Sequence, residues 1–258
     1  MMPGAPSCFC GFTGRGVRIA VIDSGIHPDH DHIDASRLGP GVSVFPDGSI
    51  DAGENATLDR LGHGTAVTAA IQEKAPDAIC LPVRVFDAAL RTSTAAILSA
   101  IRWSIAHEAD IINLSLGSSN VTHREPFAFA VKAAIEAGSA IVAAHDNDGT
   151  PCYPGGLADA IGVGLDWRCP RTQYRATQKD NTVVFLASGY PRPIPGVPAQ
   201  RNLSGVSFAV AQMTGFVARA CEKLTRKPRN PTIEDIRESL RAEAATVGEE
   251  EGRPDQAD

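Results

Sequence analysis

The sequence of 258 residues lacks the long apolar and long basic runs that mark membrane-spanning and nucleic-acid-binding chains. No stretch approaches the roughly 20 apolar residues that a helix needs to cross a bilayer. Lysine and arginine number 24 against 30 aspartates and glutamates, which gives a formal net charge of -6. Because nucleic-acid phosphates bind basic surfaces, we expect no nucleic acid and no membrane among the partners of this chain.

The first ten residues also lack the basic segment and the following apolar segment of a secretory signal peptide. If the chain is full length, the cytoplasm is its expected location. Six cysteines in a chain of this kind do not indicate a disulfide framework. Cys8 and Cys10 form a C-x-C pair with no second pair nearby, so free thiols are expected there, with metal binding as the alternative.

The composition, with 43% hydrophobic and 21% charged residues, is that of a globular domain with an ordinary core. Short apolar runs rich in β-branched residues alternate with segments of helical periodicity, which predicts an α/β domain with a mostly parallel central sheet flanked by helices on both faces. We expect strands over 17–22, 78–86, 110–116, 139–144, 160–164 and 182–186, helices over 64–73, 93–108, 126–137, 207–224 and 232–241, and a surface loop over 26–60.

No internal repeat or linker divides the chain, so we expect a single domain. We place it over residues 14–245, with an N-terminal extension over 1–13. The residues 246–258 are polar and are expected to form a disordered tail.

Three short segments carry an aspartate, a histidine and a serine among small residues. They are Val-Ile-Asp-Ser-Gly at 21–25, Gly-His-Gly-Thr at 62–65 and Leu-Ser-Gly-Val-Ser-Phe-Ala at 203–209. Taken alone, each is also typical of a helix cap or a turn. In the order Asp23, His63 and Ser207, they match one known chain order of a serine catalytic triad.

The three residue types supply complementary chemistry. A serine hydroxyl is a weak nucleophile near neutral pH, so it needs a base within hydrogen-bond reach, and the base needs an orienting acid. Asp23 follows a predicted strand, where open α/β sheets place their sites. Ser207 begins a predicted helix, whose free N–H groups favour a developing oxyanion. We therefore expect Asp23 to orient His63, and His63 to activate Ser207.

These motifs resemble those of the subtilisin-like serine protease family, peptidase S8, and the similarity extends from about residue 14 to about residue 220. The resemblance implies the family's three-layer α/β fold and cleavage of peptide bonds through an acyl-enzyme. It implies that Asn147 donates to the oxyanion together with the N–H of Ser207. It also implies a peptide or protein substrate, bound at Ser115, Leu116, Gly117, Ala144 and Asp146.

The chain departs from the family pattern next to the motifs. The second histidine expected after the histidine motif is Ala66, and the threonine expected before the serine is Val206. The proline and histidine expected after the serine are Ala211 and Gln212. The glycine expected before the oxyanion asparagine is Asp146. A carboxylate in the specificity pocket would favour Lys or Arg before the cut, whereas an Asp146 that points to solvent would only support the turn.

The sequence also bears on metals and on a pro-domain. Residues 71–81 lack the Asn-rich loop that builds the family's strong calcium site, so we expect no cofactor, with calcium as an open alternative. No pro-segment precedes Asp23, which resembles a small, intracellular or pathway-dedicated member. His30 and His32 could together ligate a metal, but a solvated loop is the default, and we expect no metal site.

The leading hypothesis is a serine endopeptidase, dedicated to processing a peptide or protein partner, with a preference for a basic residue before the cut. One alternative is a degenerate protease that holds a peptide along residues 115–117 without cutting it. Another is a transpeptidase or cyclase that passes the acyl group to an amine. The oligomeric state and the natural substrate are left open by the sequence.

Overall fold

The computed structural model describes residues 8–147, 149–179, 182–198, 201–225 and 231–245, apart from the side chain of Asn147. The strands that it defines are β1 (Arg18–Asp23), β2 (Val42–Val44), β3 (Ile50–Asp51), β4 (Ile79–Arg84), β5 (Ile111–Leu114), β6 (Ala140–Ala144), β7 (Asp146–Asn147), β8 (Thr150–Pro151), β9 (Ile161–Leu165), β10 (Arg175–Lys179) and β11 (Thr182–Ala187).

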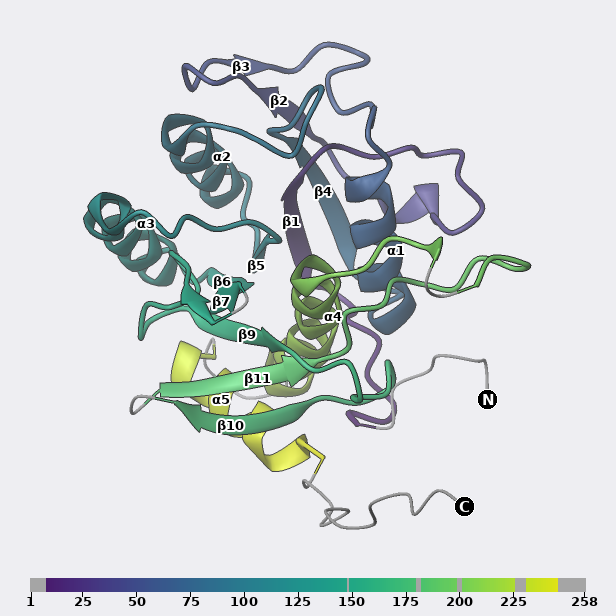
Figure 1. Cartoon of the computed structure of the whole chain (residues 1–258), viewed down its shortest axis with the longest axis vertical. Coiled ribbons are helices and arrows are strands. Elements are labelled where there is room, and N and C mark those ends of the chain that lie inside the picture. Colours follow the sequence, from purple (N-terminus) through teal and green to yellow (C-terminus); the bar gives the residue numbers. More distant parts are fainter. Residues whose placement is uncertain (1–7, 148, 180–181, 199–200, 226–230, 246–258) are drawn as a thin grey trace, which may run out of the picture.

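Nine of these strands form one twisted sheet, in the order β10-β11-β9-β6-β5-β1-β4-β2-β3 (Figure 1). The pairs β10–β11 and β2–β3 are antiparallel, and the other neighbouring pairs are parallel. The remaining two strands, β7 and β8, form a short hairpin after β6. The prediction of a mostly parallel α/β sheet is therefore confirmed.

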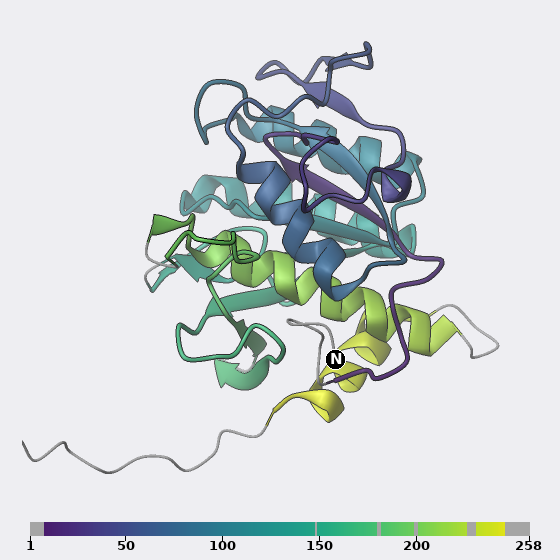
Figure 2. The same ribbon diagram turned by 90° about the vertical axis from the view of Figure 1, so that its right-hand side faces the viewer.

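Helices cover both faces of the sheet (Figure 1). The longer α-helices are α1 (His63–Lys74), α2 (Thr94–Ala106), α3 (Arg124–Glu136), α4 (Val206–Thr225) and α5 (Ile233–Glu243). Buried side chains of α1, α4 and α5 share one hydrophobic cluster, and those of α2 and α3 share another. Figure 2 shows α4 running lengthwise beside α1, with α5 beneath it.

The central strand β1 shows why two helical layers are needed. Its side chains alternate between the faces, so that Ile19 and Val21 join the cluster of α1 and α4, while Ala20 and Ile22 join that of α2 and α3. All four side chains are at most 2% exposed. A strand buried on both faces reads as a continuous apolar run, which is the pattern of this segment.

Side-chain caps fix the starts of two helices. Ser93 caps α2 by accepting a hydrogen bond from the N–H of Ala96, and Thr232 caps α5 in a reciprocal capping box with Asp235. Two strand assignments differ from the predictions. The expected loop over 26–60 contains β2 and β3, and β10 was not expected because its exposed, polar residues resemble a loop.

The first described residues contribute Cys8 and Phe9 to the core and are tied to the domain, so they do not form a separate extension. Phe9 is 1% exposed, and its backbone N–H donates to Glu243 while its carbonyl accepts from Arg219. The N–H groups of residues 13, 14 and 15 all donate to one oxygen of Glu222. We call residues 8–15 the N-terminal strap, because it ties α4 to α5. Residues 1–7 and 246–258 lie outside the described part of the chain.

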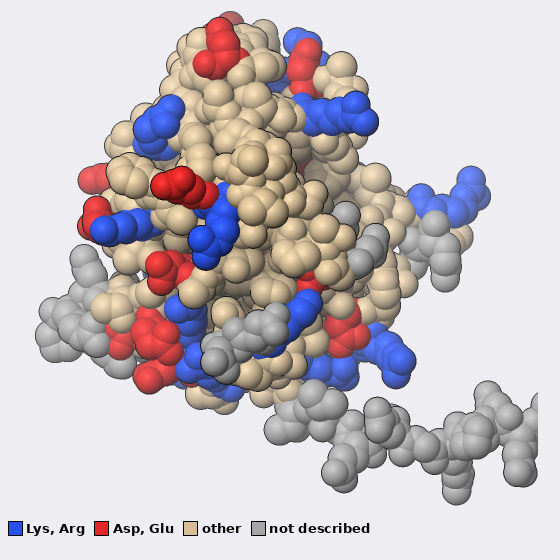
Figure 3. All heavy atoms as spheres, turned by 60° about the vertical axis from the view of Figure 1, so that its left-hand side comes forward, with Lys and Arg blue, Asp and Glu red and all other residues tan. Residues whose placement is uncertain are grey.

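No helix within the described ranges is long and apolar enough to cross a membrane. On the face drawn in Figure 3, acidic and basic side chains are interspersed around a broad area of uncharged residues.

Candidate active site

The end of β1 and the start of α1 bring Asp23 and His63 together. Oδ1 of Asp23 lies 2.7 Å from Nδ1 of His63 and also accepts the N–H of Ser24 at 2.8 Å. Asp23 is fully buried, and His63 is 9% exposed. Burial alone would lower the pKa of His63, but the hydrogen bond and the charge of Asp23 outweigh it and raise that pKa. The pair therefore suits a base held in one orientation.

Glycine on both sides of His63 has a structural reason. Gly62, the N-cap of α1, has a φ of 75°, in the left-handed region that glycine adopts without strain. A Cβ on Gly64 would collide with the carbonyl oxygen of Gly25. The first turn of α1 can therefore lie directly against the chain that leaves β1, which places His63 beside Asp23.

A second buried carboxylate, Asp59, holds the turn before His63. Its Oδ1 accepts from the hydroxyl of Ser24 at 2.8 Å and from the N–H groups of Leu61 and Gly62, both at 2.9 Å. Its Oδ2 accepts from the N–H and hydroxyl of Thr65, at 2.9 and 2.6 Å. Burial alone would raise the pKa of Asp59, but these hydrogen bonds outweigh it and lower that pKa.

Ser207 lies in the first turn of α4, at the ends of the central strands. Its hydroxyl donates to the carbonyl of Ser115 at 3.0 Å, and the hydroxyl of Ser115 donates to the carbonyl of Ser207 at 3.3 Å. Below them, Asn113 of β5 donates to the hydroxyl of Thr214 of α4 at 2.8 Å. These contacts fix the start of α4 against the end of β5.

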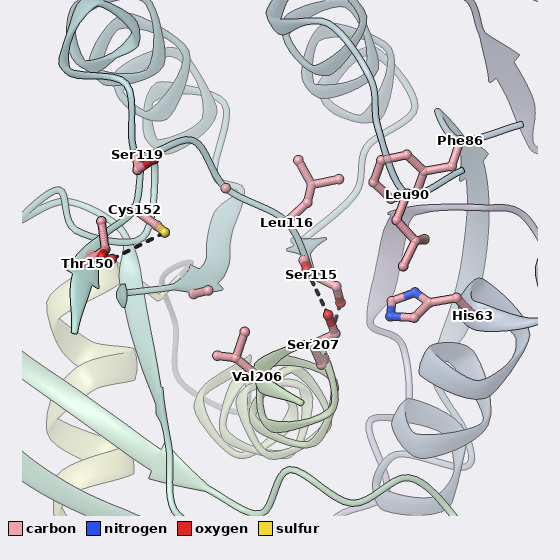
Figure 4. Close-up of a pocket in the computed structure, with 12 residues that line it drawn as sticks. His63, Phe86, Leu90, Ser115, Leu116, Ser119, Thr150, Cys152, Val206 and Ser207 are labelled. Atoms are coloured by element: carbon pink, nitrogen blue, oxygen red, sulfur yellow. Dashed lines mark hydrogen bonds between the residues drawn. The ribbon is translucent and has the colours of Figure 1, made fainter. Parts of the chain in front are cut away.

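His63 and Ser207 line one cavity of about 430 Å³. Figure 4 shows the imidazole pointing toward Ser207 across the mouth of this cavity. No hydrogen bond joins the two side chains among the described residues, because the serine hydroxyl is turned toward Ser115. Contacts between a catalytic base and its nucleophile are often long before substrate binds, so this arrangement is compatible with a triad.

Two segments form opposite walls of the cavity. One wall contains Ser115 and Leu116, and the other contains Thr150 and Cys152 (Figure 4). A Cβ added to Gly117 would lie 3.0 Å from Cβ of Cys152, so the walls approach closely at this point. Of the expected substrate-binding residues, Ser115, Leu116, Gly117 and Ala144 line the cavity.

Asp146 lies elsewhere. Its carboxylate forms an ion pair with Lys179 at 2.9 Å and accepts the N–H of Gly149 at 3.2 Å. Burial would raise the pKa of Asp146, but these partners outweigh it and lower that pKa. Asp146 is not among the residues that line the cavity. The backbone of Asn147 pairs with Thr150 in the β7–β8 hairpin, but its side chain lies outside the described part, so its oxyanion role stays a prediction.

The residues that depart from the family pattern have definite places. Val206 lines the cavity beside Ser207. Gln212 is buried in α4 and donates to the carbonyls of Ser188 and Tyr190, at 2.7 and 3.1 Å.

Among the residues that the structure describes, no group of three or more His, Cys, Asp or Glu is arranged to hold a metal ion. Burial raises the pKa of Cys8 to about 12, which keeps that thiol protonated.

Local sequence patterns offer little sign of Asp59 and Cys152. An aspartate four residues before the histidine motif was the available signal for Asp59, but its main partners, Ser24 and Thr65, lie on different segments. Cys152 reaches the cavity only because the β7–β8 hairpin turns the chain back toward α4.

The chain matches known proteins over most of its length. A sequence model of the subtilase family matches residues 14–256. Subtilisin BL of Lederbergia lenta is 30% identical over 257 residues, covering 92% of this chain and 87% of that protein. An alkaline protease of Alkalihalobacillus alcalophilus is also 30% identical over 257 residues, but this chain spans only 61% of its length.

Solved structures show the same fold. A cold-adapted subtilisin-like serine proteinase superimposes with a TM-score of 0.65 at 22% identity, covering 90% of this chain and 83% of that one. A lanthipeptide protease superimposes with a TM-score of 0.65 at 19% identity, covering 86% of this chain and 78% of that one.

Proposed function

The chain belongs to the subtilase family of serine proteases, and from this we propose that it is a serine endopeptidase that cleaves a peptide or protein substrate through an acyl-enzyme. The observation that carries the proposal is the 2.7 Å contact between Asp23 and His63, at the rim of the cavity that also contains Ser207.

In the proposed mechanism, the substrate carbonyl enters the cavity beside Ser207. The serine hydroxyl leaves the carbonyl of Ser115, gives its proton to His63 and attacks the substrate carbon. Asp23 holds the imidazole in the tautomer that accepts this proton and stabilises the imidazolium that forms. His63 then protonates the leaving amine, and water releases the acyl group by the reverse sequence. We assign Asn147 and the N–H of Ser207 to the oxyanion.

Residues 115–117 are proposed to pair with the peptide backbone before the scissile bond, because strand addition of this kind holds many peptide sequences. The residues described as lining the cavity carry no carboxylate, and Asp146 is already paired with Lys179. We therefore replace the expected basic preference with a preference for an uncharged side chain before the cut. A cleaved peptide library in which Lys and Arg dominate at that position would contradict this.

We also propose that the enzyme processes one dedicated peptide or protein partner in the cytoplasm. A structural neighbour is described as a lanthipeptide protease, but at 19% identity the likeness shows the fold alone. The support for a dedicated role is the close packing of Gly117 against Cys152, which limits the size of the side chain that the cavity accepts. Cleavage of unrelated denatured proteins at many positions would count against this role.

A second candidate function is peptide binding without cleavage. The specific observation in its favour is that the Ser207 hydroxyl bonds to Ser115 and not to His63.

Labelling with a fluorophosphonate separates the two functions. An active serine is modified stoichiometrically at neutral pH, the Ser207→Ala protein is not, and the matched Ser204→Ala protein, changed at an exposed serine three residues earlier, still reacts. Folded wild-type protein that resists the probe would favour the binding function. Mass spectrometry of the products then distinguishes hydrolysis from transfer to an amine.

A further inference from the structure

A second cavity, of about 350 Å³, lies beside the start of α1. Three separate segments enclose it: residues 27–32, residues 62–69, and residues 191–194 with 201–203 of the loop between β11 and α4. Figure 1 shows this loop passing beside α1. The two cavities have no lining residue in common. Ala66, where the family pattern has a histidine, presents only a methyl group to this cavity, which leaves room for a ligand.

The ionisable residues that line this second cavity are all basic. They are two arginines and three histidines, namely Arg192, Arg201, His27, His30 and His32, and no carboxylate is among the lining residues that the structure describes. The chain as a whole has the opposite balance, with 30 acidic and 24 basic residues. A cationic cavity in an acidic protein is suited to a negatively charged ligand.

Both guanidinium groups are available to a ligand. Within the described ranges, no carboxylate lies within ion-pair distance of Arg192 or Arg201. Arg192 uses one N–H on the carbonyl of His32 at 3.2 Å, and its own carbonyl accepts from Asn202 at 3.4 Å. Arg192 is therefore held at the cavity wall with most of its donors unused, since a guanidinium has five.

The titration of His32 is consistent with a cationic surrounding. Burial lowers the pKa of His32, and the neighbouring Arg192 and His30 lower it further, although the carboxylates of Asp31 and Glu73 act in the other direction. Ile194 and Leu203 supply apolar surface around the charges. A charged contact gains strength where apolar surface reduces the screening by water.

The position of the cavity indicates which part of a substrate reaches it. Gly62 directly precedes His63, and Leu203 lies four residues before Ser207, so this cavity lies close to the residues of the proposed triad. In the proposed function, the first cavity receives the residues before the scissile bond. The second cavity, which shares no lining residue with the first, is then available to the residues that follow this bond.

We propose that the second cavity is a carboxylate-binding subsite for the part of the substrate that follows the scissile bond. This inference rests on the proposed endopeptidase function. The ligand chemistry is a carboxylate, either of an Asp or Glu side chain or of the C-terminus of the substrate, since guanidinium groups bind carboxylates through paired N–H donors. The subsite would thus select peptides that carry an Asp or Glu a few residues after the cut, or peptides whose C-terminus lies there.

Two pairs of fluorogenic peptides with identical residues before the cut test the proposal. In one pair the end is amidated, and Glu or Gln occupies one of the three positions after the cut. In the other pair all these positions are uncharged, and the end is a free carboxylate or an amide. We expect the charged member of at least one pair to show about fivefold higher kcat/KM at low salt, as for one partly screened ion pair, and a smaller advantage in 0.5 M NaCl.

Substitutions locate the effect. The Arg192→Gln/Arg201→Gln protein should lose most of the charge preference, whereas Arg102→Gln, which changes an exposed arginine on α2 across the sheet, should keep it. A wild-type ratio near one in both pairs would overturn the subsite. A preference that survives in the double variant would also overturn it.

Binding to Ser207→Ala protein separates this proposal from the proposed function. Fluorescence anisotropy with the same labelled peptides measures the subsite without any turnover. Tighter binding of the charged peptide, together with wild-type protein that neither hydrolyses nor reacts with fluorophosphonate, would support the subsite and reject the endopeptidase. Equal binding by all four peptides, with active wild-type enzyme, would reject the subsite alone.

Discussion

Replacing Asp59 by alanine should damage both the stability of the fold and the placement of His63. The carboxylate accepts five hydrogen bonds, from Ser24, Leu61, Gly62 and twice from Thr65. It is 4% exposed, so water does not replace it readily. The substitution removes a group that no sequence motif identified, yet every one of its donors lies within a few residues of Asp23 or His63.

The size of the effect follows from which donors lose their partners. Gly62 is exposed and Leu61 half-buried, so their N–H groups can turn to water, whereas the N–H and hydroxyl of Thr65 and the hydroxyl of Ser24 remain buried. Each buried donor left unsatisfied costs about 1–3 kcal/mol, and the hydroxyls can rotate to recover part of this. We expect a loss of about 3–4 kcal/mol in the free energy of unfolding, which a domain of typical stability survives.

The remaining folded protein should be a poor enzyme. His63 directly follows the turn that Asp59 holds, and a displacement of about 1 Å in a reacting group can reduce the rate about 10²-fold. We therefore expect kcat to fall about 10²-fold while KM changes little. Asp59→Asn keeps one acceptor oxygen but places an NH₂ group opposite donors. Its free energy of unfolding and its kcat should therefore lie between those of the wild type and those of Asp59→Ala.

Urea unfolding of these variants in a Ser207→Ala background, where self-cleavage is absent, measures the stability. Asp34→Ala is the control, because Asp34 accepts two hydrogen bonds from Ser36 at an exposed site, where a loss of about 0.5 kcal/mol is typical. An Asp59→Ala protein within 1 kcal/mol of its parent, or one with unchanged kcat, would refute the reasoning.

Three further predictions concern other parts of the structure. The pKa of His63 is raised and the base must be neutral, so kcat/KM should rise with pH through an apparent pKa above about 6.5. The Asp23→Asn variant should lower this apparent pKa and should reduce kcat by about 10⁴-fold. A pH profile that does not change in Asp23→Asn would contradict this. Burial lowers the pKa of Lys74 to about 8, so between pH 8 and about 10.4 the unfolded chain binds one more proton than the folded chain. As the pH rises through this range, the free energy of unfolding of the wild type should therefore increase relative to that of Lys74→Met. Urea titrations that give the two proteins the same pH dependence would count against this. Gly117→Ala should lower kcat/KM more for peptides with a large side chain before the cut than for peptides with alanine there, because the added methyl group lies against Cys152. Adding Cys152→Gly to this variant should reverse the loss. Equal effects on both peptides would show that the contact between residues 117 and 152 does not set the width of the cavity.

Local sequence patterns were sufficient to place the three residues of the proposed triad at the ends of their elements. Each lies at the end of an element that its own sequence defines: Asp23 after a buried apolar run, His63 at the start of a helix flanked by glycines, and Ser207 in the first turn of a long buried helix. The strands of the central sheet were found for the same reason, because burial on both faces leaves a continuous apolar signal.

The missed features depend on contacts between distant segments. The five donors of Asp59 include Ser24, 35 residues away, which no local pattern shows. The edge strand β10 is exposed and polar, and it is ordered by its pairing with β11. The second cavity is enclosed by three segments, the last of which follows the other two by more than a hundred residues, so its charge is visible only once they are brought together.

The N-terminal strap has a consequence for how the protein is made. Residues 8–15 emerge from the ribosome more than 200 residues before their partners Arg219, Glu222 and Glu243. The central strand β1 also waits for β4 and β5 before it has neighbours. A nascent chain therefore carries Asp23 and His63 without a nucleophile until Ser207 has been made. Contacts this distant in sequence form late and slowly, so the proposed site cannot be complete until α4, which carries Ser207, has been made and packed.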